Sequence, residues 1–170
     1  MKYYLIVGEA SGDLHASHLM SALKAVDSQA EFRFYGGDMG QAVGGTLVCH
    51  YRNLAYMGFL PVLMHARTIL RGMADCKRDI LNWKPDAVIL VDYPGFNLLY
   101  ALAMDFLKIK VVWYIAPHLW IWGKWRLPVL AKICRKMLVI FPFEVEVFAP
   151  TVLTATFVGH PLADMVKERA

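Results

Sequence analysis

The sequence predicts an α/β fold in which helices cover both faces of a parallel sheet. Two observations support this prediction. The expected strands are short runs of consecutive apolar residues, which is typical of strands buried on both faces. These runs alternate with segments in which apolar residues recur at helical spacing. With 170 residues, the chain is long enough to bury a full core, and we expect one domain, 1–170.

The first half of the chain predicts three strands and two helices. The apolar run at 3–8 predicts a strand, and apolar residues at helical spacing predict a helix over about 12–26. A second strand at 31–35 ends at a glycine pair, and a short strand is expected at 46–49. Apolar residues then recur with a helical period over 62–81, which predicts the second helix.

The second half continues the alternation. The segment Trp83-Lys84-Pro85-Asp86 ends the preceding helix and leads into the apolar run at 87–91, which predicts a strand. The elements expected after it are a helix over 95–107, a strand over 110–115, a helix over 125–135, and strands over 137–141 and 155–158. Strands separated by helices in this way predict a Rossmann-like sheet.

Composition narrows the functional classes. Hydrophobic residues make up 58% of the chain and charged residues 19%, so we expect an apolar surface in addition to the core. The net charge of +4 suits anionic partners, such as phosphorylated metabolites, nucleic acid or an acidic membrane. The three cysteines are far apart, and no CxxC or Cys/His cluster occurs, which argues against disulfides and zinc and favours a reducing compartment.

The sequence contains no segment that we expect to target the chain to a membrane or to span one. It begins directly with a predicted strand, and we expect no signal peptide. The longest apolar stretches, 56–64 and 111–122, contain proline and are shorter than the ~20 residues that span a bilayer. Between Phe106 and Phe143 there are seven basic residues, no acidic one and several tryptophans. This mixture suits a membrane surface or single-stranded nucleic acid, and it also fits ordinary solvated helix faces.

Two loops are the strongest candidates for a site. The strand at 3–8 leads into Gly8-Glu9-Ala10-Ser11-Gly12-Asp13, and the strand at 87–91 leads into Asp92-Tyr93-Pro94-Gly95-Phe96-Asn97. In an open parallel sheet, ligands bind outside the carboxyl ends of the strands. We therefore expect both loops to lie at one edge of the sheet and to form the active site.

The first loop has the residues of an anion-binding turn. Gly8 and Gly12 allow tight turning and close backbone approach, and Ser11 is a candidate cap of the following helix, whose amino end attracts anions. A plain strand-to-helix turn with a serine cap explains the same residues. The glycine spacing is not GxGxxG, so a dinucleotide site is unsupported.

Asp92 is the stronger candidate. A carboxylate at the end of a buried strand is held on rigid backbone, as a general base requires. The alternative is that Asp92 caps the helix over 95–107. Glu9 and Asn97 are candidate partners of substrate hydroxyls. His118 and His160 each adjoin a proline, and we expect them to be structural loop histidines.

The chain resembles the lipid-A-disaccharide synthase family. The similarity covers essentially the whole chain and depends on short motifs that are specific in combination. Besides the two loops, the motifs are Tyr56-Met57-Gly58-Phe59, Ala116-Pro117-His118-Leu119-Trp120-Ile121-Trp122, Phe141-Pro142-Phe143-Glu144 and Gly159-His160-Pro161-Leu162. Ile121 is a small departure, because the family usually has a small residue there.

The resemblance implies a two-Rossmann-domain (GT-B type) glycosyltransferase. The family transfers 2,3-diacylglucosamine from its UDP conjugate to 2,3-diacylglucosamine 1-phosphate, with inversion, and releases UDP. Asp92 matches the position expected for the base. The resemblance further implies no metal and no cofactor. The substrate-binding residues expected are Gly8, Glu9, Ser11, Gly12, Asp13, Met57, Gly58, Asn97 and Trp120.

The family is peripheral on the cytoplasmic face of the inner membrane, and the resemblance implies the same location here. The residues expected to contact membrane or acyl chains are Phe59, Leu60, Leu63, Arg67 and Arg71. They could instead cover the core beneath a long loop. The family is about twice as long as this chain, so we expect an N-terminal, acceptor-side half, with the UDP-sugar domain elsewhere and with a C-terminal half or a second copy as possible partner. Nucleic acid is not an expected partner.

Two other functions stay open. The first is a sugar-nucleotide enzyme of similar architecture, such as a UDP-sugar epimerase, and dependence of activity on acyl chains would distinguish it. The second is a non-catalytic nucleotide- or phosphate-binding module, for which replacement of Asp92 would leave turnover unaffected.

Overall fold

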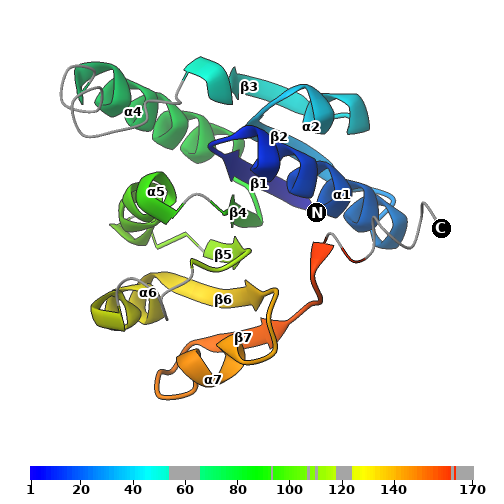
Figure 1. Ribbon diagram of the computed structural model, residues 1–170. Coiled ribbons are helices and arrows are strands. Elements are labelled where there is room, and N and C mark those ends of the chain that lie inside the picture. The colour runs from blue at the N-terminus through cyan, green and yellow to red at the C-terminus, as the bar shows by residue number, and fades with distance from the viewer. Residues whose placement is uncertain are drawn as a thin grey trace.

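The computed structural model shows a seven-stranded sheet with helices on both sides (Figure 1). It describes residues 1–53, 66–92, 94–106, 108–109, 111–117, 124–161 and 163. The strands are β1 (Lys2–Val7), β2 (Glu31–Gly36), β3 (Thr46–His50), β4 (Ala87–Val91), β5 (Val111–Tyr114), β6 (Cys134–Val139) and β7 (Thr154–Phe157). Their order in the sheet is β3-β2-β1-β4-β5-β6-β7, and every neighbouring pair is parallel. The predicted parallel α/β sheet is confirmed.

Helices divide between the two faces of the sheet. They are α1 (Ala10–Val26), α2 (Asp38–Val43), α4 (Ala66–Trp83), α5 (Pro94–Phe106), α6 (Leu127–Ile133) and α7 (Glu144–Phe148), with 3-10 turns at Tyr51–Asn53 and Lys124–Arg126. In Figure 1, α1 and α2 lie on one side, and α4, α5 and α6 lie on the other. Met20 of α1 is buried in the core of the first side, and Ile80, Tyr100 and Leu130 are buried in the core of the second.

Three differences from the predicted elements have physical causes. The short helices α2 and α7 were not predicted, because five or six residues are too few to show a helical period. The strand β6 begins at Cys134, three residues before the predicted start at 137, and the helix before it ends at Ile133. Arg135 and Lys136 are exposed at this end of the strand, so the apolar run that marks a strand starts only after them.

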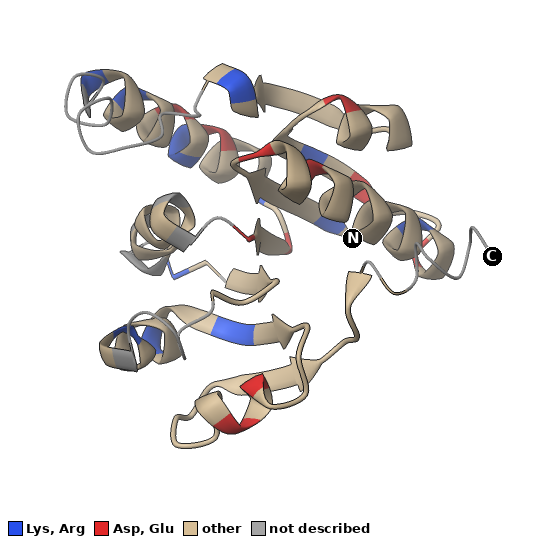
Figure 2. Ribbon diagram, in the orientation of Figure 1, with Lys and Arg blue, Asp and Glu red and all other residues tan. Residues whose placement is uncertain are grey.

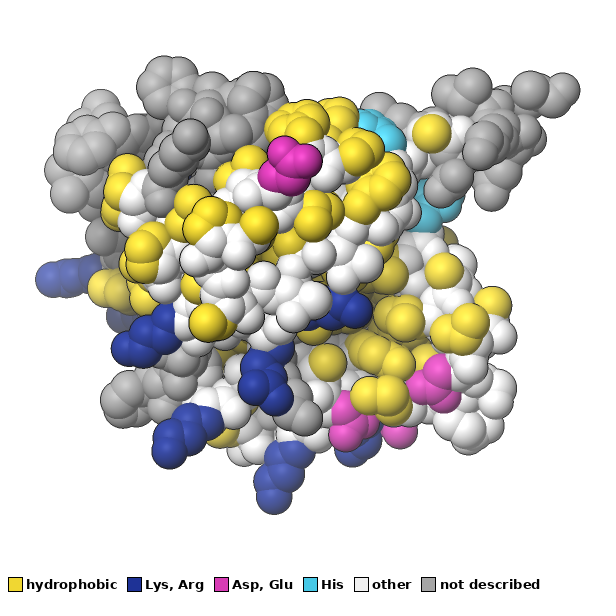
Figure 3. All heavy atoms as spheres, turned by 90° about the horizontal axis from the view of Figure 1, so that it is seen from below, with side chains coloured by type: hydrophobic (Ala, Val, Ile, Leu, Met, Phe, Trp, Pro, Cys, Tyr) yellow, Lys and Arg dark blue, Asp and Glu magenta, His cyan; other side chains and the backbone are white. Residues whose placement is uncertain are grey.

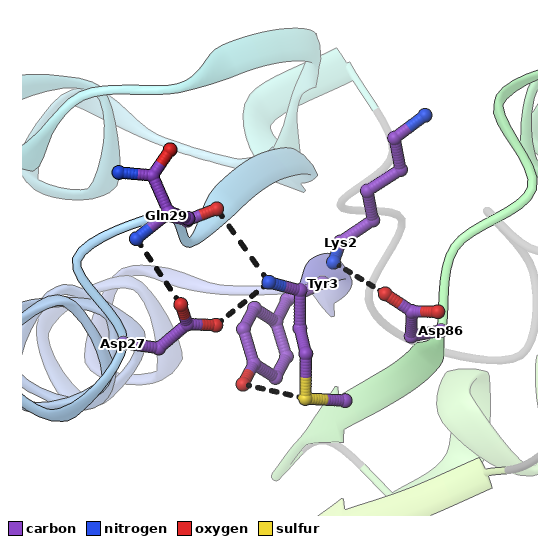
Figure 4. A network of polar contacts seen from close by, with 6 residues as sticks. Lys2, Tyr3, Asp27, Gln29 and Asp86 are labelled. Carbon is purple, nitrogen blue, oxygen red and sulfur yellow. Dashed lines mark hydrogen bonds and ion pairs between the residues drawn. The ribbon is translucent and has the colours of Figure 1, made fainter.

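The amino-terminal edge of the sheet is fixed by a polar network (Figure 4). The Met1 ammonium group lies 2.7 Å from Oδ2 of Asp27, which follows α1. The backbone N–H of Lys2 donates to Oδ2 of Asp86 at 2.8 Å, and the N–H of Gln29 donates to Oδ1 of Asp27 at 3.1 Å. These bonds hold α1, β1 and β4 together at the edge opposite the predicted site.

A second network joins α4 to β1 and β2. Asp79 of α4 accepts two hydrogen bonds from the Arg33 guanidinium, at 2.7 and 2.6 Å, and one from the hydroxyl of Tyr4 at 2.8 Å. Burial raises the pKa of the Asp79 carboxyl, but the hydrogen bonds from Arg33 and Tyr4 outweigh it and leave this pKa below its ordinary value. The network therefore fixes α4 against the sheet as an ion pair.

The edge strand β7 borders an apolar surface. Viewed from below (Figure 3), this end of the molecule exposes hydrophobic side chains across much of its face, with basic side chains gathered toward one side. The exposed large hydrophobic residues in or beside α7 and β7 include Phe143, Val152, Phe157 and Val158. The composition predicted an apolar surface in addition to the core, and Figure 3 shows exposed hydrophobic side chains on this face. None of the helices in the described ranges is both long and apolar enough to cross a bilayer.

Candidate active site at the carboxyl end of β1 and β4

The two candidate loops lie side by side, as the sequence predicted. β1 and β4 are neighbours in the sheet, and Val7 pairs with Val91 at the last position of each strand. The chain order reverses here, because β2 lies on one side of β1 and β4 lies on the other. A reversal of this kind opens a crevice outside the strand ends, where α/β proteins bind ligands. We refer to the loops 8–13 and 92–97 together as the rim.

Gly12 sets how closely α1 approaches the sheet. A Cβ at this position would lie 3.0 Å from Cγ1 of Val7 and 3.7 Å from the carbonyl oxygen of Val91. Gly12 is buried, as is Gly8. The prediction of close backbone approach at Gly12 is therefore correct, and the partners are the two strands themselves.

The prediction that Ser11 caps the helix is wrong. The helix α1 begins at Ala10, so Glu9 is its N-cap, and Ser11 already lies inside the first turn. The Ser11 hydroxyl donates instead to Oε1 of Glu9 at 2.6 Å. Ser11 is exposed and Glu9 is half-buried, so both side chains are accessible at the rim.

Asp13 has a structural role in this loop. Its side chain is 3% exposed, and its Oδ1 accepts the backbone N–H groups of Gly37 at 2.8 Å and Gly40 at 3.2 Å. Its Oδ2 accepts the N–H of Met39 at 2.9 Å. These donors belong to the first turn of α2 and the residue before it, so Asp13 caps α2 from another helix. The sequence grouped Asp13 with the substrate contacts, and this capping role was not predicted.

Asp92 follows β4 in a left-handed backbone conformation, with φ of 48°. Its backbone N–H donates to the carbonyl oxygen of Tyr114 at 3.0 Å, and its side chain is half-buried. A non-glycine residue in this conformation costs free energy, and such residues concentrate at functional sites. Helix α5 begins at Pro94, so the N-cap position falls one residue beyond Asp92, and this does not support the alternative role of Asp92 as the cap.

The residue after the neighbouring strand, β5, also has a left-handed backbone conformation. Ile115 directly follows β5 and has φ of 62°, which is rare for a β-branched residue. Its backbone N–H donates to the carbonyl oxygen of Leu138 at 3.1 Å. Two adjacent strands, β4 and β5, thus both end in a left-handed residue. The other two described non-glycine residues with positive φ, Lys84 and Lys108, lie before the same two strands.

Asn97 is fully buried in the first turns of α5, with 0% of its surface exposed. Its Nδ2 donates to the carbonyl oxygen of Val91 at 3.0 Å and to that of Asp92 at 2.7 Å. The sequence pointed to Asn97 as a partner of substrate hydroxyls. The structure places its amide against the backbone of the Asp92 turn.

His15 lies next to the rim, and the sequence did not single it out. It lies in α1, three residues after Gly12, and its buried Nδ1 has no hydrogen-bond partner among the described residues. Desolvation lowers the pKa of His15, while the negative charge of Asp92 raises it. His160 and His18 are also near enough to lower this pKa. The only signal available in the sequence was a polar residue two positions after the first loop.

Several predicted residues lie outside the described part of the chain. They are Met57, Gly58, Phe59, Leu60, Leu63 and Trp120. Arg67 and Arg71 are described, and both are exposed on α4. Figure 2 shows basic positions along α4 and acidic positions at the start of α1. Within the described ranges, no group of three or more His, Cys, Asp or Glu side chains is arranged to hold a metal ion.

Solved structures with this fold include a UDP-GlcNAc 2-epimerase and MurG. The UDP-GlcNAc 2-epimerase of Neisseria meningitidis bound to UDP-GlcNAc matches with a TM-score of 0.71 and 10% identity, over 99% of this chain and 49% of that one. MurG of Acinetobacter baumannii matches with a TM-score of 0.58 and 15% identity, over 95% of this chain and 46% of that one. At these identities the likeness shows the fold alone. It defines the class as a Rossmann-like fold of the GT-B type.

The family follows from the sequence comparison. Residues 3–170 match the model of the lipid-A-disaccharide synthetase family, and the chain belongs to it. The lipid-A-disaccharide synthase of Geobacter metallireducens is 39% identical over 162 residues, which cover 95% of this chain and 42% of the relative. That of Chromohalobacter salexigens is 37% identical over 164 residues, or 96% of this chain and 42% of the relative. The chain therefore spans less than half the length of these relatives.

Proposed function

We propose that the chain forms the acceptor-side half of a lipid-A-disaccharide synthase. The reaction would transfer 2,3-diacylglucosamine from its UDP conjugate to 2,3-diacylglucosamine 1-phosphate, with inversion of the anomeric carbon. One observation carries the proposal beyond the family match. Asp92 stands at the end of β4, in a left-handed conformation, beside the amino end of α1. A fixed carboxylate at the ligand-binding edge of the sheet suits a general base.

The proposed chemistry has one proton transfer and one substitution. The Asp92 carboxylate takes the proton of the acceptor hydroxyl while the hydroxyl oxygen attacks the anomeric carbon of the donor. The bond from that carbon to the UDP oxygen breaks on the opposite face, and UDP leaves with the electron pair. Attack from the face opposite the leaving group inverts the centre. The rim supplies positioning, which contributes a large part of such rate enhancements.

The other rim residues have proposed binding roles. Glu9 and Ser11 are accessible and hydrogen-bonded to each other, so they can contact hydroxyl groups of the acceptor sugar. The amino end of α1, a helix of 17 residues, favours negative charge and suits the acceptor phosphate. Gly8 and Gly12 keep the backbone of the loop close to the strands. Met57, Gly58 and Trp120 stay predicted substrate contacts.

We also propose that α4 borders a membrane contact. Arg67 and Arg71 are exposed there, and the apolar side chain of Leu70 between them is 64% exposed. Exposed apolar and basic groups together are typical of proteins that lie on anionic bilayers. The predicted apolar contacts Phe59, Leu60 and Leu63 precede this helix in the sequence. The proposed location is the cytoplasmic face of the inner membrane.

Liposome sedimentation tests the membrane contact. Replacing Arg67 and Arg71 with glutamine should weaken binding to vesicles that contain anionic lipid by about 2 kcal/mol, because each basic group near the surface contributes ~1 kcal/mol. Lys84→Gln, at an exposed position just beyond the other end of α4, is the control and should bind like the parent. Equal binding of all three proteins would place the contact elsewhere.

The transfer reaction itself can be assayed in an enzyme that carries this chain as its amino-terminal segment. Purified donor and acceptor should give the disaccharide 1-phosphate and UDP in equal amounts. An acceptor without acyl chains should react poorly. Epimerisation of the donor without an acceptor would favour the alternative enzyme, and binding without any turnover would favour the non-catalytic module.

A further inference from the structure

Asn97 has no surface with which to contact a substrate. Its side chain is 0% exposed, and its Nδ2 donates to the carbonyl oxygens of both Val91 and Asp92. We propose that Asn97 is a positioning residue, which holds the Asp92 peptide in its left-handed conformation and so directs the carboxylate toward the acceptor. This inference rests on the proposed function only in its last step, the use of the carboxylate as a base.

The backbone just after β4 needs a side-chain hydrogen-bond donor, because the chain leaves the sheet there. The N–H of Asp92 makes the last bond to β5, at 3.0 Å from the carbonyl oxygen of Tyr114. After it the chain turns out of the sheet, and Pro94 has no N–H to offer. The carbonyl group of Val91 is buried and that of Asp92 is partly buried, and both need donors because an unpaired carbonyl shielded from water is costly. The Asn97 amide supplies both bonds from a residue only five positions after Asp92.

The geometry fixes the orientation of the amide. The side of Asn97 that faces the two carbonyl oxygens must carry the NH2 group, because an oxygen there would face two acceptors. Asp92 is thus held at both backbone groups, by β5 through its N–H and by α5 through its C=O. With its backbone fixed, the carboxylate of Asp92 keeps only the freedom of its own side-chain torsions. A base held in this way needs little reorganisation when substrate binds.

The contact can be tested first in the 170-residue chain. Asn97→Ala removes both donors and leaves the helix. NMR of residue 92 should then lose the backbone couplings and carbonyl shifts of a left-handed residue. Met104→Ala is the control, because Met104 is equally buried in α5 and lies about two helical turns further from the Asp92 turn. It should lower the melting temperature and leave residue 92 unchanged. A left-handed residue 92 in Asn97→Ala would overturn the proposal.

Turnover in the transfer-competent enzyme tests the functional step. Asn97→Ala should lower kcat about 10- to 100-fold, the range expected for misplacing a catalytic group, with little change in KM. If Asn97 acts through Asp92, the double variant Asp92→Asn with Asn97→Ala should be no slower than Asp92→Asn alone. Met104→Ala should keep the parent kcat.

The outcomes separate this inference from the proposed function. Losses that multiply in the double variant would show that Asn97 does not act through Asp92 and would reject the inference while keeping the base. Normal turnover in Asp92→Asn would reject the base, and the NMR experiment alone would then decide whether Asn97 fixes the turn.

Discussion

His15 shows at the scale of one residue how the rim joins separate elements. It belongs to α1, yet Asp92 of the β4–α5 turn and His160 near the end of the chain both affect its pKa. His15 and Asp92 are far apart in the sequence and come close because β1 and β4 are neighbours in the sheet. The mutual influence of His15 and Asp92 is therefore a sensitive measure of how the rim is arranged.

An NMR titration of the His15 ring in the 170-residue chain tests this arrangement. The midpoint should lie below the ordinary value of ~6.5, because burial disfavours the charged ring. Asp92→Asn should lower it further, since the Asp92 charge opposes the effect of burial. His15→Gln identifies the signal by removing it. A midpoint that rises or stays constant in Asp92→Asn would mean that the two groups are not close.

The sign of this shift has a consequence for stability. The unfolded chain binds a proton at His15 at a higher pH than the folded chain does. The contribution of His15 to the free energy of unfolding is therefore fully present above the unfolded pKa of ~6.5. This contribution is lost as the pH falls through the folded pKa. Between these two pKa values, the free energy of unfolding of the parent should decrease as the pH falls. In His15→Gln it should decrease less.

The sequence predicted the position of Asp92 at the end of β4 better than the roles of the neighbouring polar residues. Asp92 could be found because it directly follows an apolar strand. Asp13 and Asn97 are also polar residues of the two loops, and the sequence suggested substrate contacts for both. Their hydrogen bonds go to backbone groups of α2 and of the Asp92 turn. Which backbone groups these side chains reach depends on the conformation of each turn. That conformation cannot be predicted from the spacing of residues in the sequence.

At the scale of elements, α2 depends on a residue outside itself. It has six residues and no side-chain cap from its own N-cap, Gly37. Asp13 of α1 supplies the carboxylate that its first N–H groups need. This explains why the sequence did not predict α2: its stability comes from a contact between helices. The strands were predicted because burial on both faces makes their sequences continuously apolar.

Asp13→Ala should therefore destabilise the fold. It removes three hydrogen bonds to a charged acceptor, and the N–H groups of Gly37 and Gly40 are left buried. We expect a loss of about 2–4 kcal/mol in the free energy of unfolding, measured with urea. Asp38→Asn changes an exposed carboxylate of α2 and should cost much less. Similar losses in the two variants would contradict the capping role.

At the scale of the whole molecule, the proposed function places the acceptor-binding site on this chain. The relatives are more than twice as long as the segment they share with it. We propose that the part of the relatives outside this segment supplies most of the UDP-sugar site. The parallel sheet and the placing of both loops at one edge of it could be predicted from the sequence, since both follow from the alternation of strands and helices. The strand order was not predicted. The donor side could not, because it requires residues beyond those matched.

UDP should therefore have little effect on the melting temperature of the 170-residue chain. A ligand stabilises only the folded form that binds it, and a site with micromolar affinity would add ~4 kcal/mol at about 1,000 times its Kd. Thermal unfolding with increasing UDP measures this directly. A shift that saturates at micromolar UDP would show that the nucleotide site lies within these residues.

The base assignment is the central claim, and turnover of Asp92→Asn tests it most directly. In the transfer-competent enzyme this variant keeps the shape of the side chain and removes its basicity, so turnover should fall at least ~100-fold. Asp86→Asn is the matched control, because Asp86 adjoins the opposite end of the same strand, β4. It should turn over at close to the parent rate. A folded Asp92→Asn enzyme with near-parent turnover would contradict the account.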